Sequence, residues 1–130
     1  MSNFLTANYH AHTFRCQHAV GNERDYIEAA IKMGIKEFGF SDHIPCPFRD
    51  GYISHIRMTM DEAPEYVKTI RALADEYQND IRIYVGFEAE YIREFYKEQM
   101  NMVQALGVGY LVMGQHFLLS EESGPYMGTP

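Results

Sequence analysis

The sequence predicts an α/β fold in which parallel strands alternate with helices. Two observations support this prediction: four short apolar segments alternate with segments of helical spacing, and each apolar segment ends in, or is closely followed by, a histidine or a glutamate. At 130 residues, the chain is expected to form one domain, residues 1–130, with a buried core. Strand–helix–strand units of this length form parallel sheets with right-handed crossovers, and functional residues gather at the carboxyl ends of such strands.

The first half of the chain contains two strand candidates with a helix between them. Residues 4–10, FLTANYH, form the first strand candidate, and residues 35–40, IKEFGF, form the second. Asn22 is expected to cap the helix, because Asp25 follows it at capping-box spacing. Gly34 ends this helix, and its apolar face consists of Tyr26, Ile27, Ala30 and Ile31.

The second half repeats the alternation after a long loop at residues 44–58. The next helix is expected to begin near Thr59 or Asp61, because Pro64 is tolerated only in the first turn of a helix. The apolar positions of this helix are Ala63, Val67, Ile70, Ala74 and Tyr77. The remaining expected elements are a strand at 81–88, a helix at about 92–106 and a strand at 110–116.

The composition is that of a soluble, folded domain, with 46% hydrophobic and 22% charged residues. A formal net charge of −7 argues against general nucleic-acid binding, because phosphate contacts need a basic surface. No apolar run approaches the roughly 20 residues of a membrane span. The first ten residues, MSNFLTANYH, lack the basic start and apolar run of a signal peptide. We therefore expect a cytoplasmic protein that binds neither nucleic acid nor membrane.

Metal-binding side chains stand at the predicted ends of all four strands. His10 and His12 are two residues apart, so they point to the same side of a strand and can hold one ion between them. His43, Glu88 and His116 follow the other three strands. These ends meet at one rim of a parallel sheet, where such side chains would be costly to desolvate without partners. We therefore expect a metal site at this rim.

The glutamate and the aspartate near this rim are candidate catalytic residues. Glu88 has two carboxylate oxygens and can bridge two ions, whereas a neutral imidazole binds only one. Two ions about 3.5–4 Å apart can activate water and clamp the oxygens of a transferring phosphoryl group. Asp42 is expected to orient a ligand ring; the alternative is that it caps a loop or a helix.

Two arginines and a glutamine are candidate contacts for a phosphate substrate. Arg15 and Arg57 flank the predicted mouth of the site, and guanidinium groups bind phosphate in a bidentate way. Arg57 is also a candidate catalytic residue, and Gln17 is a candidate substrate contact beside Arg15. The alternative for both arginines is a solvated loop position. His55, which lies in the long loop, is expected not to be a metal ligand.

Five stretches carry a family resemblance: YHAHTFRCQHA, GFSDHIPCPF, RMTMDEAPEYV, GFEAEYI and GQHF, which together span nearly the whole chain. They resemble the PHP (polymerase and histidinol phosphatase) superfamily, most closely its bacterial histidinol-phosphatase branch. The first histidine pair alone would also fit amidohydrolases, but these lack His18 and the Ser-Asp-His element. The resemblance implies a distorted, TIM-like barrel of seven strand–helix units, of which this chain holds about the first four.

The resemblance also implies an activity and a set of ligands. The implied enzyme is a metal-dependent phosphatase that hydrolyses L-histidinol phosphate to L-histidinol and phosphate in histidine biosynthesis. It implies up to three divalent ions, and zinc, manganese and iron all suit the ligands. The implied ligands are His10 and His12 for the first ion, Glu88 between the first and the second, His116 for the second, and His18 and His43 for the third.

The resemblance is to the N-terminal half of such enzymes, whose remaining ligands come from later strands. Two other functions are therefore open: a phosphoesterase for another small phosphate ester, and a non-catalytic metal-binding half-domain. Four units would leave one edge of the sheet unpaired. We therefore expect self-association or a complementary C-terminal half.

Overall fold

The computed structural model describes residues 6–16, 22–48, 51–52 and 54–114. Within these residues the strands are β1 (Ala7–Ala11), β2 (Glu37–His43), β3 (Arg82–Ala89) and β4 (Tyr110–Met113). The α-helices are α1 (Glu23–Lys32), α2 (Ala63–Glu76) and α3 (Tyr96–Leu106), and two 3-10 turns are η1 (Phe14–Cys16) and η2 (Met60–Glu62).

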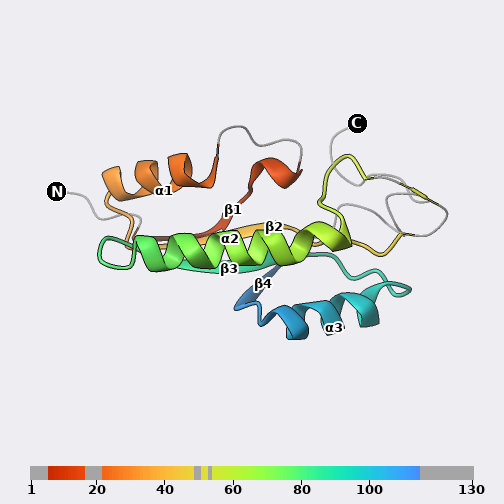
Figure 1. The fold of residues 1–130 in the computed structure, drawn as a ribbon. Coiled ribbons are helices and arrows are strands. Elements are labelled where there is room, and N and C mark those ends of the chain that lie inside the picture. The colour runs from red at the N-terminus through yellow and green to blue at the C-terminus, as the bar shows by residue number, and fades with distance from the viewer. Residues whose placement is uncertain (1–5, 17–21, 49–50, 53, 115–130) are drawn as a thin grey trace.

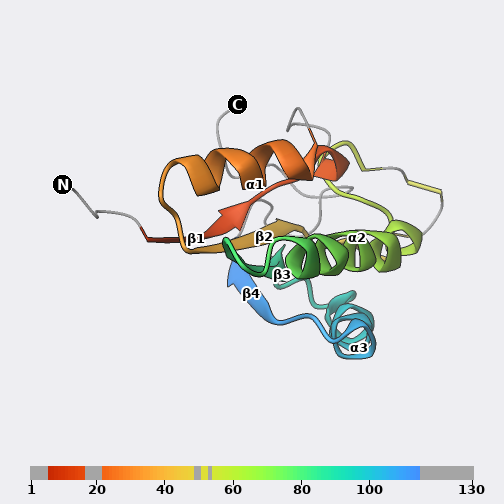
Figure 2. The same cartoon turned by 60° about the vertical axis from the view of Figure 1, so that its left-hand side comes forward.

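The strands form one parallel sheet in the order β1-β2-β3-β4, so each strand lies beside its neighbour in the sequence. The sheet curls as part of a barrel, with α1, α2 and α3 arranged around it (Figures 1 and 2). The predicted α/β class is confirmed, and the described residues contain four parallel strands with a helix in each of the three connections. Of the predicted strand at 110–116, β4 covers Tyr110–Met113; Gly114 follows it, and residues 115 and 116 lie outside the described part of the chain.

The first helix begins at its predicted cap, the second begins just after the predicted region of Thr59 and Asp61, and the third begins later than predicted. Asn22 Oδ1 accepts a hydrogen bond from the Asp25 backbone N–H at 2.9 Å, which completes the expected capping box. A second capping box at Thr59 begins the 3-10 turn η2, and α2 follows from Ala63 with its proline in the first turn. The third helix begins at Tyr96 rather than near residue 92, because the preceding turn packs Ile92 and Phe95 against Cys46.

One hydrophobic cluster joins the sheet to its helices. Apolar side chains of β2 and β3 pack against the buried faces of α1 and α2, and side chains of α3 contact the same cluster. Its members include Phe38, Phe40, Ile83, Val85 and Phe87 from the strands and Ile27, Ala30, Tyr66, Val67 and Ile70 from the helices. This packing fixes the strands relative to one another, and therefore fixes the positions of the side chains at their carboxyl ends.

Tyrosines cover the opposite face of the sheet. The ring centroid of Tyr9 lies 6.1 Å from that of Tyr84 and 5.9 Å from that of Tyr110. Tyr110 packs over Gly39 and Gly86. A Cβ at Gly86 would lie 2.5 Å from the carbonyl oxygen of Tyr110. Burial raises the pKa of Tyr110 to about 12, so its hydroxyl stays protonated and donates to the Tyr9 carbonyl at 2.6 Å.

Candidate metal centre

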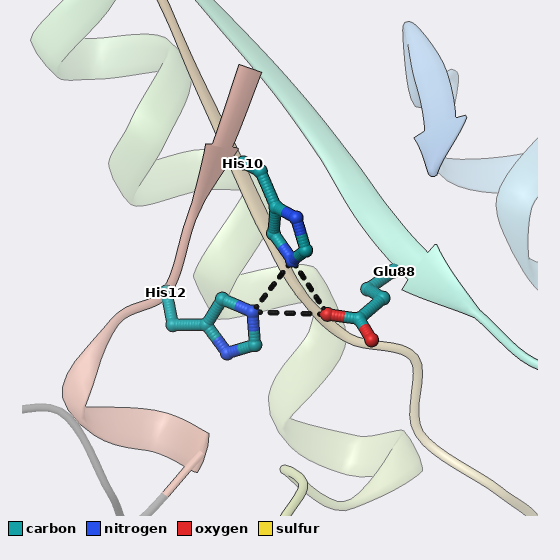
Figure 3. A group of neighbouring side chains, drawn as sticks. All are labelled: His10, His12 and Glu88. Atoms are coloured by element: carbon teal, nitrogen blue, oxygen red, sulfur yellow. Dashed lines mark hydrogen bonds and ion pairs between the residues drawn. The ribbon is translucent and has the colours of Figure 1, made fainter. Parts of the chain in front are cut away.

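Two histidines and a glutamate converge at the carboxyl ends of β1 and β3 (Figure 3). Glu88 Oε1 lies 2.6 Å from His10 Nε2 and 3.1 Å from His12 Nε2, and the two nitrogens are 3.2 Å apart. His10 lies in β1, His12 follows that strand, and Glu88 is the next-to-last residue of β3. The structure thus brings together three of the predicted ligands from positions far apart in the sequence.

An irregularity in β1 helps to aim these side chains. The register between β1 and β2 shifts between Asn8 and Ala11, and Asn8 Oδ1 accepts a hydrogen bond from the His10 backbone N–H at 3.0 Å. Consecutive residues of a regular strand point to opposite faces, but Tyr9 and His10 both contact the face of β3 that carries Glu88. Bulges re-aim side chains in this way near functional sites.

The second oxygen of Glu88 faces a different set of groups. His43 is the register partner of Glu88 across β2 and β3, and its Nδ1 lies 4.0 Å from Glu88 Oε2. On the other side, a Cβ at Gly114 would lie 2.5 Å from the same oxygen, so only a glycine leaves this space open. With Oε1 between His10 and His12 and Oε2 towards His43, the carboxylate has the orientation expected of a bridging ligand.

Asp42 and Thr13 lie behind His12, and both are fully buried. Asp42 Oδ2 accepts hydrogen bonds from the backbone N–H of Thr13, at 3.1 Å, and from its hydroxyl. Asp42 Oδ1 faces His12 Nδ1 at 3.6 Å. Burial raises the pKa of Asp42, and the hydrogen bonds from Thr13 oppose this shift. The role of Thr13 is not visible in the sequence, because its position next to His12 gives no sign that it contacts Asp42 in β2.

The donor set fits a divalent ion. Two imidazole nitrogens and a carboxylate oxygen, all within 4.8 Å of one another, suit zinc, manganese or iron. Glu88 is only 5% exposed, and a buried carboxylate needs positive charge or several donors around it. Gly114 has no Cβ, so no side chain at this position fills the space beside Oε2. Of the other predicted ligands, His18 and His116 lie outside the described residues, as does the candidate substrate contact Gln17.

The structure buries Arg15 and pairs it with two glutamates, of which Glu23 is buried and Glu65 is exposed. Its guanidinium pairs with Glu23 at the start of α1 and with Glu65 in α2, the latter at 2.7–2.9 Å. Burial alone would lower the pKa of Arg15, but the hydrogen bonds with Glu65 and Glu23 outweigh it and raise the pKa. The predicted solvated alternative is therefore wrong for Arg15, and its contact with substrate stays a prediction.

Arg57 is also buried, and the sequence analysis did not identify its partner. Its Nη2 donates to Glu90 Oε1 at 2.8 Å, and its Nη1 donates to the Ile44 carbonyl at 2.8 Å. A pocket of about 210 Å³ lies against Arg57 and is lined also by Phe48 and Tyr52. His10, His12 and Glu88 do not line this pocket. The solvated alternative is wrong here too, and the catalytic and substrate roles of Arg57 stay predictions. His55, by contrast, is exposed, as expected of a loop residue.

The fold is that of part of an α/β barrel domain, with a group of side chains that could hold a metal ion at the carboxyl ends of its parallel strands. Residues 8–129 match the PHP domain family, and the chain belongs to this family. No helix among the described residues is long and apolar enough to cross a membrane.

Curated relatives and a solved structure agree with this assignment. The chain is 31% identical over 121 residues to the histidinol-phosphatase of Bacillus subtilis, covering 88% of this chain and 45% of that protein. It is 30% identical over 109 residues to the probable histidinol-phosphatase of Deinococcus radiodurans, covering 84% and 41%. A histidinol phosphate phosphatase structure from Lactococcus lactis, complexed with zinc, L-histidinol and phosphate, superposes with a TM-score of 0.70 at 22% identity, covering 85% and 40%. The chain thus spans less than half the length of each of these proteins.

Proposed function

We propose that this chain forms part of the active site of a metal-dependent phosphatase that hydrolyses L-histidinol phosphate to L-histidinol and phosphate, in the cytoplasm, as a step of histidine biosynthesis. The observation that carries the proposal is the convergence of His10, His12 and Glu88 at the strand ends of a PHP domain. The histidinol-phosphatase relatives support this substrate, and the Lactococcus lactis structure supports zinc as the metal.

The side chains have distinct roles in this proposal. His10, His12 and Glu88 would hold the first ion, and Glu88 with His43, which faces its second carboxylate oxygen, would contribute to a further one. A bound divalent ion supplies an activated water and neutralises charge on the phosphoryl oxygens. Asp42 orients the ring of His12, because its Oδ1 faces the Nδ1 of that ring. His18 and His116 complete a set of up to three ions.

Substrate recognition is assigned to the groups predicted from the sequence. Arg57 and Gln17 contact the phosphate in this proposal, and Arg57 would have to exchange its pairing with Glu90 for one with the substrate. Arg15 is the weakest of the three candidates, because Glu23 and Glu65 already occupy its guanidinium.

The length of the relatives supports a further part of the proposal, which concerns the partner. The family relatives are more than twice as long as the part that this chain matches. We propose that a complementary C-terminal half, or a second copy of the chain, completes the site. The alternatives are a phosphoesterase for another small phosphate ester and a metal-binding half-domain without catalysis.

Metal content and turnover separate these possibilities. The chain is purified without chelator, its metals are counted by elemental analysis, and phosphate release is followed with L-histidinol phosphate and with other small phosphate esters. Two or three ions with turnover of histidinol phosphate support the proposal, and faster turnover of another ester would change the substrate. One ion or none, without turnover, would favour the metal-binding half-domain. Glu88→Gln is the control for the role of the carboxylate in metal content and turnover, because it keeps the side-chain size and removes the charge.

A further inference from the structure

The hydroxyl of Tyr110 joins the two outer strands of the sheet. Tyr110 lies in β4 and donates to the Tyr9 carbonyl in β1 at 2.6 Å, although the strand order β1-β2-β3-β4 puts two strands between them. Neighbouring strands lie about 4.7–4.9 Å apart, so three such intervals in a flat sheet would exceed the reach of a tyrosine side chain. The contact therefore depends on the curl of the sheet (Figure 2).

Two glycines make room for the Tyr110 side chain where it crosses the intervening strands. A Cβ at Gly86 in β3 would lie 2.8 Å from ring carbons Cδ1 and Cε1, and a Cβ at Gly39 in β2 would lie 2.9 Å from Cζ. A side chain at either position would push the ring away from the sheet. The path of Tyr110 to β1 thus depends on glycine in both strands that it crosses.

The crossing side chain reaches β1 at its irregularity. Asn8 and Ala11 are three residues apart in β1, but their register partners in β2 are only two residues apart. Tyr9 and His10 therefore stand opposite a single residue, Gly39, which is the arrangement of a β-bulge. The hydrogen bond from β4 ends on the first of these two bulged residues.

Two side chains hold the peptide group between Tyr9 and His10. Its C=O belongs to Tyr9 and accepts from the Tyr110 hydroxyl, and its N–H belongs to His10 and donates to Asn8 Oδ1 at 3.0 Å. Because a peptide group is planar, contacts at both of its ends fix the orientation of the plane. His10 follows directly and points to Glu88, with 2.6 Å between Nε2 and Oε1 (Figure 3).

We propose that Tyr110 and Asn8 are positioning residues, which hold the Tyr9–His10 peptide in the bulge and thereby direct the side chain of His10 to Glu88. The effect on metal binding rests on the proposed function, whereas the held peptide is a property of the metal-free chain. Removing groups that support a metal ligand typically weakens binding about 10- to 100-fold.

Hydrogen exchange of the His10 amide in the metal-free chain is the first test. In the wild type we expect this amide to exchange more slowly than in an unstructured peptide, because Asn8 Oδ1 accepts its hydrogen. Tyr110→Phe keeps the ring and removes the hydroxyl, and it is expected to lose most of this protection while the Phe87 amide in β3 exchanges as in the wild type. A general loss of stability would instead speed the exchange of both amides.

Tyr84→Phe is the matched control for this test. The ring of Tyr84 lies on the same face, 6.1 Å from that of Tyr9, but its hydroxyl lies beside Arg82 rather than at the peptide. We expect this variant to keep the protection of the His10 amide. Equal protection in folded Tyr84→Phe and Tyr110→Phe would overturn the proposal, as would an unprotected His10 amide in the wild type.

Variants at Asn8 test the other end of the peptide, and they do not depend on the folding of Tyr110→Phe. Asn8→Leu removes the acceptor, and it is expected to lose the protection of the His10 amide and to bind Zn²⁺ about 10- to 100-fold more weakly, measured by competition with a chelator. Asn8→Asp keeps an acceptor oxygen and is expected to retain both properties near their wild-type values. Equal protection of the His10 amide in the two folded variants would contradict the proposal. If the expected protection is found but the wild type binds no Zn²⁺, the proposed function fails and the positioning of His10 stands.

Discussion

Gly114 lies so close to Glu88 that a Cβ on it would be 2.5 Å from Glu88 Oε2. Gly114 follows β4, and its backbone N–H donates to the Ala89 carbonyl at 2.9 Å, which holds the two strand ends together. The contact is with the oxygen that faces His43 rather than with the oxygen between His10 and His12. The end of the fourth strand therefore limits where the second carboxylate oxygen can lie.

Gly114→Ala is expected to weaken metal binding, because the added methyl group would displace the Glu88 carboxylate. The loss is expected to be about tenfold or more, in the range found when groups supporting a ligand are changed. Titration with Zn²⁺ in the presence of a chelator measures it. Gly109→Ala is the matched control, because its Cβ would lie at an ordinary 3.5 Å from the Val85 carbonyl. Equal affinity of the two variants would show that the space at Gly114 is not needed.

Glu88→Ala is expected to remove more than one metal ion, because each carboxylate oxygen faces a different set of histidines. Elemental analysis of protein purified without chelator gives the number of ions per chain. His55→Ala is the control, since this exposed loop histidine is expected not to bind metal. Loss of a single ion from Glu88→Ala would refute the bridging role, and an unchanged content would exclude Glu88 as a ligand.

The ends of the strands could be predicted from sequence, because their signals are local. Alternating apolar segments gave the parallel sheet, and His10, His12, His43 and Glu88 were expected at one rim because the carboxyl ends of parallel strands meet there. The capping box at Asn22 and the helix start near Thr59 were equally local. In each case the residue type and a short spacing determine the structure.

The environment of these side chains could not be predicted, because it depends on contacts between distant segments. Nothing near Arg57 in the sequence indicates its pairing with Glu90, 33 residues away. Strand alternation predicts opposite faces for Tyr9 and His10, and the register shift in β1 is what allows both to face β3. Long polar side chains are usually solvated, so burial of Arg15 and Arg57 required knowledge of their partners.

Arg57→Ala is expected to lower the free energy of unfolding by about 3–5 kcal/mol, because it removes one member of a buried ion pair and leaves the Glu90 carboxylate without the charge of Arg57. Denaturant titration measures this loss. The double variant Arg57→Ala with Glu90→Ala is expected to recover part of it, since no charge is then left unpaired. An Arg57→Ala chain as stable as the wild type would contradict the structural role. In a complete enzyme, loss of turnover without loss of stability would instead favour the predicted phosphate contact.

The pair of Glu65 with Arg15 is expected to make stability depend on acid pH. Hydrogen bonds from Arg15 and then from Thr69 hold the pKa of Glu65 below its ordinary 4.5. A carboxyl group with a depressed folded-state pKa stabilises the fold above its unfolded pKa and loses that contribution as the pH falls through the folded value. Glu65→Gln is therefore expected to be less stable than wild type at pH 7. The difference in urea midpoint should shrink below pH 4.5, and a constant difference across that range would contradict the argument.

The isolated chain is expected to turn over histidinol phosphate far more slowly than a complete barrel. Only part of the ligand set predicted for the family can come from these residues, so ions would bind more weakly and water would take the remaining positions. Steady-state phosphate release at saturating metal measures this. Turnover at ordinary enzyme rates, about 1 to 10³ per second, by a monomeric chain would refute the need for further strands.

Self-association through β4 is the last expectation. Among the described residues β4 pairs only with β3. On the face of β4 that does not carry Tyr110, the side chains are exposed, with Leu111 at 36% and Met113 at 68%. An unpaired strand edge with apolar side chains favours association with another chain. Light scattering is expected to show a mass that rises with concentration, and Met113→Lys is expected to reduce it. Met33→Lys is the matched control, because Met33 is similarly exposed, at 72%, but lies at the end of α1 away from the sheet edge. A mass that stays monomeric at every concentration, or an equal effect of both lysines, would show that this edge does not mediate association.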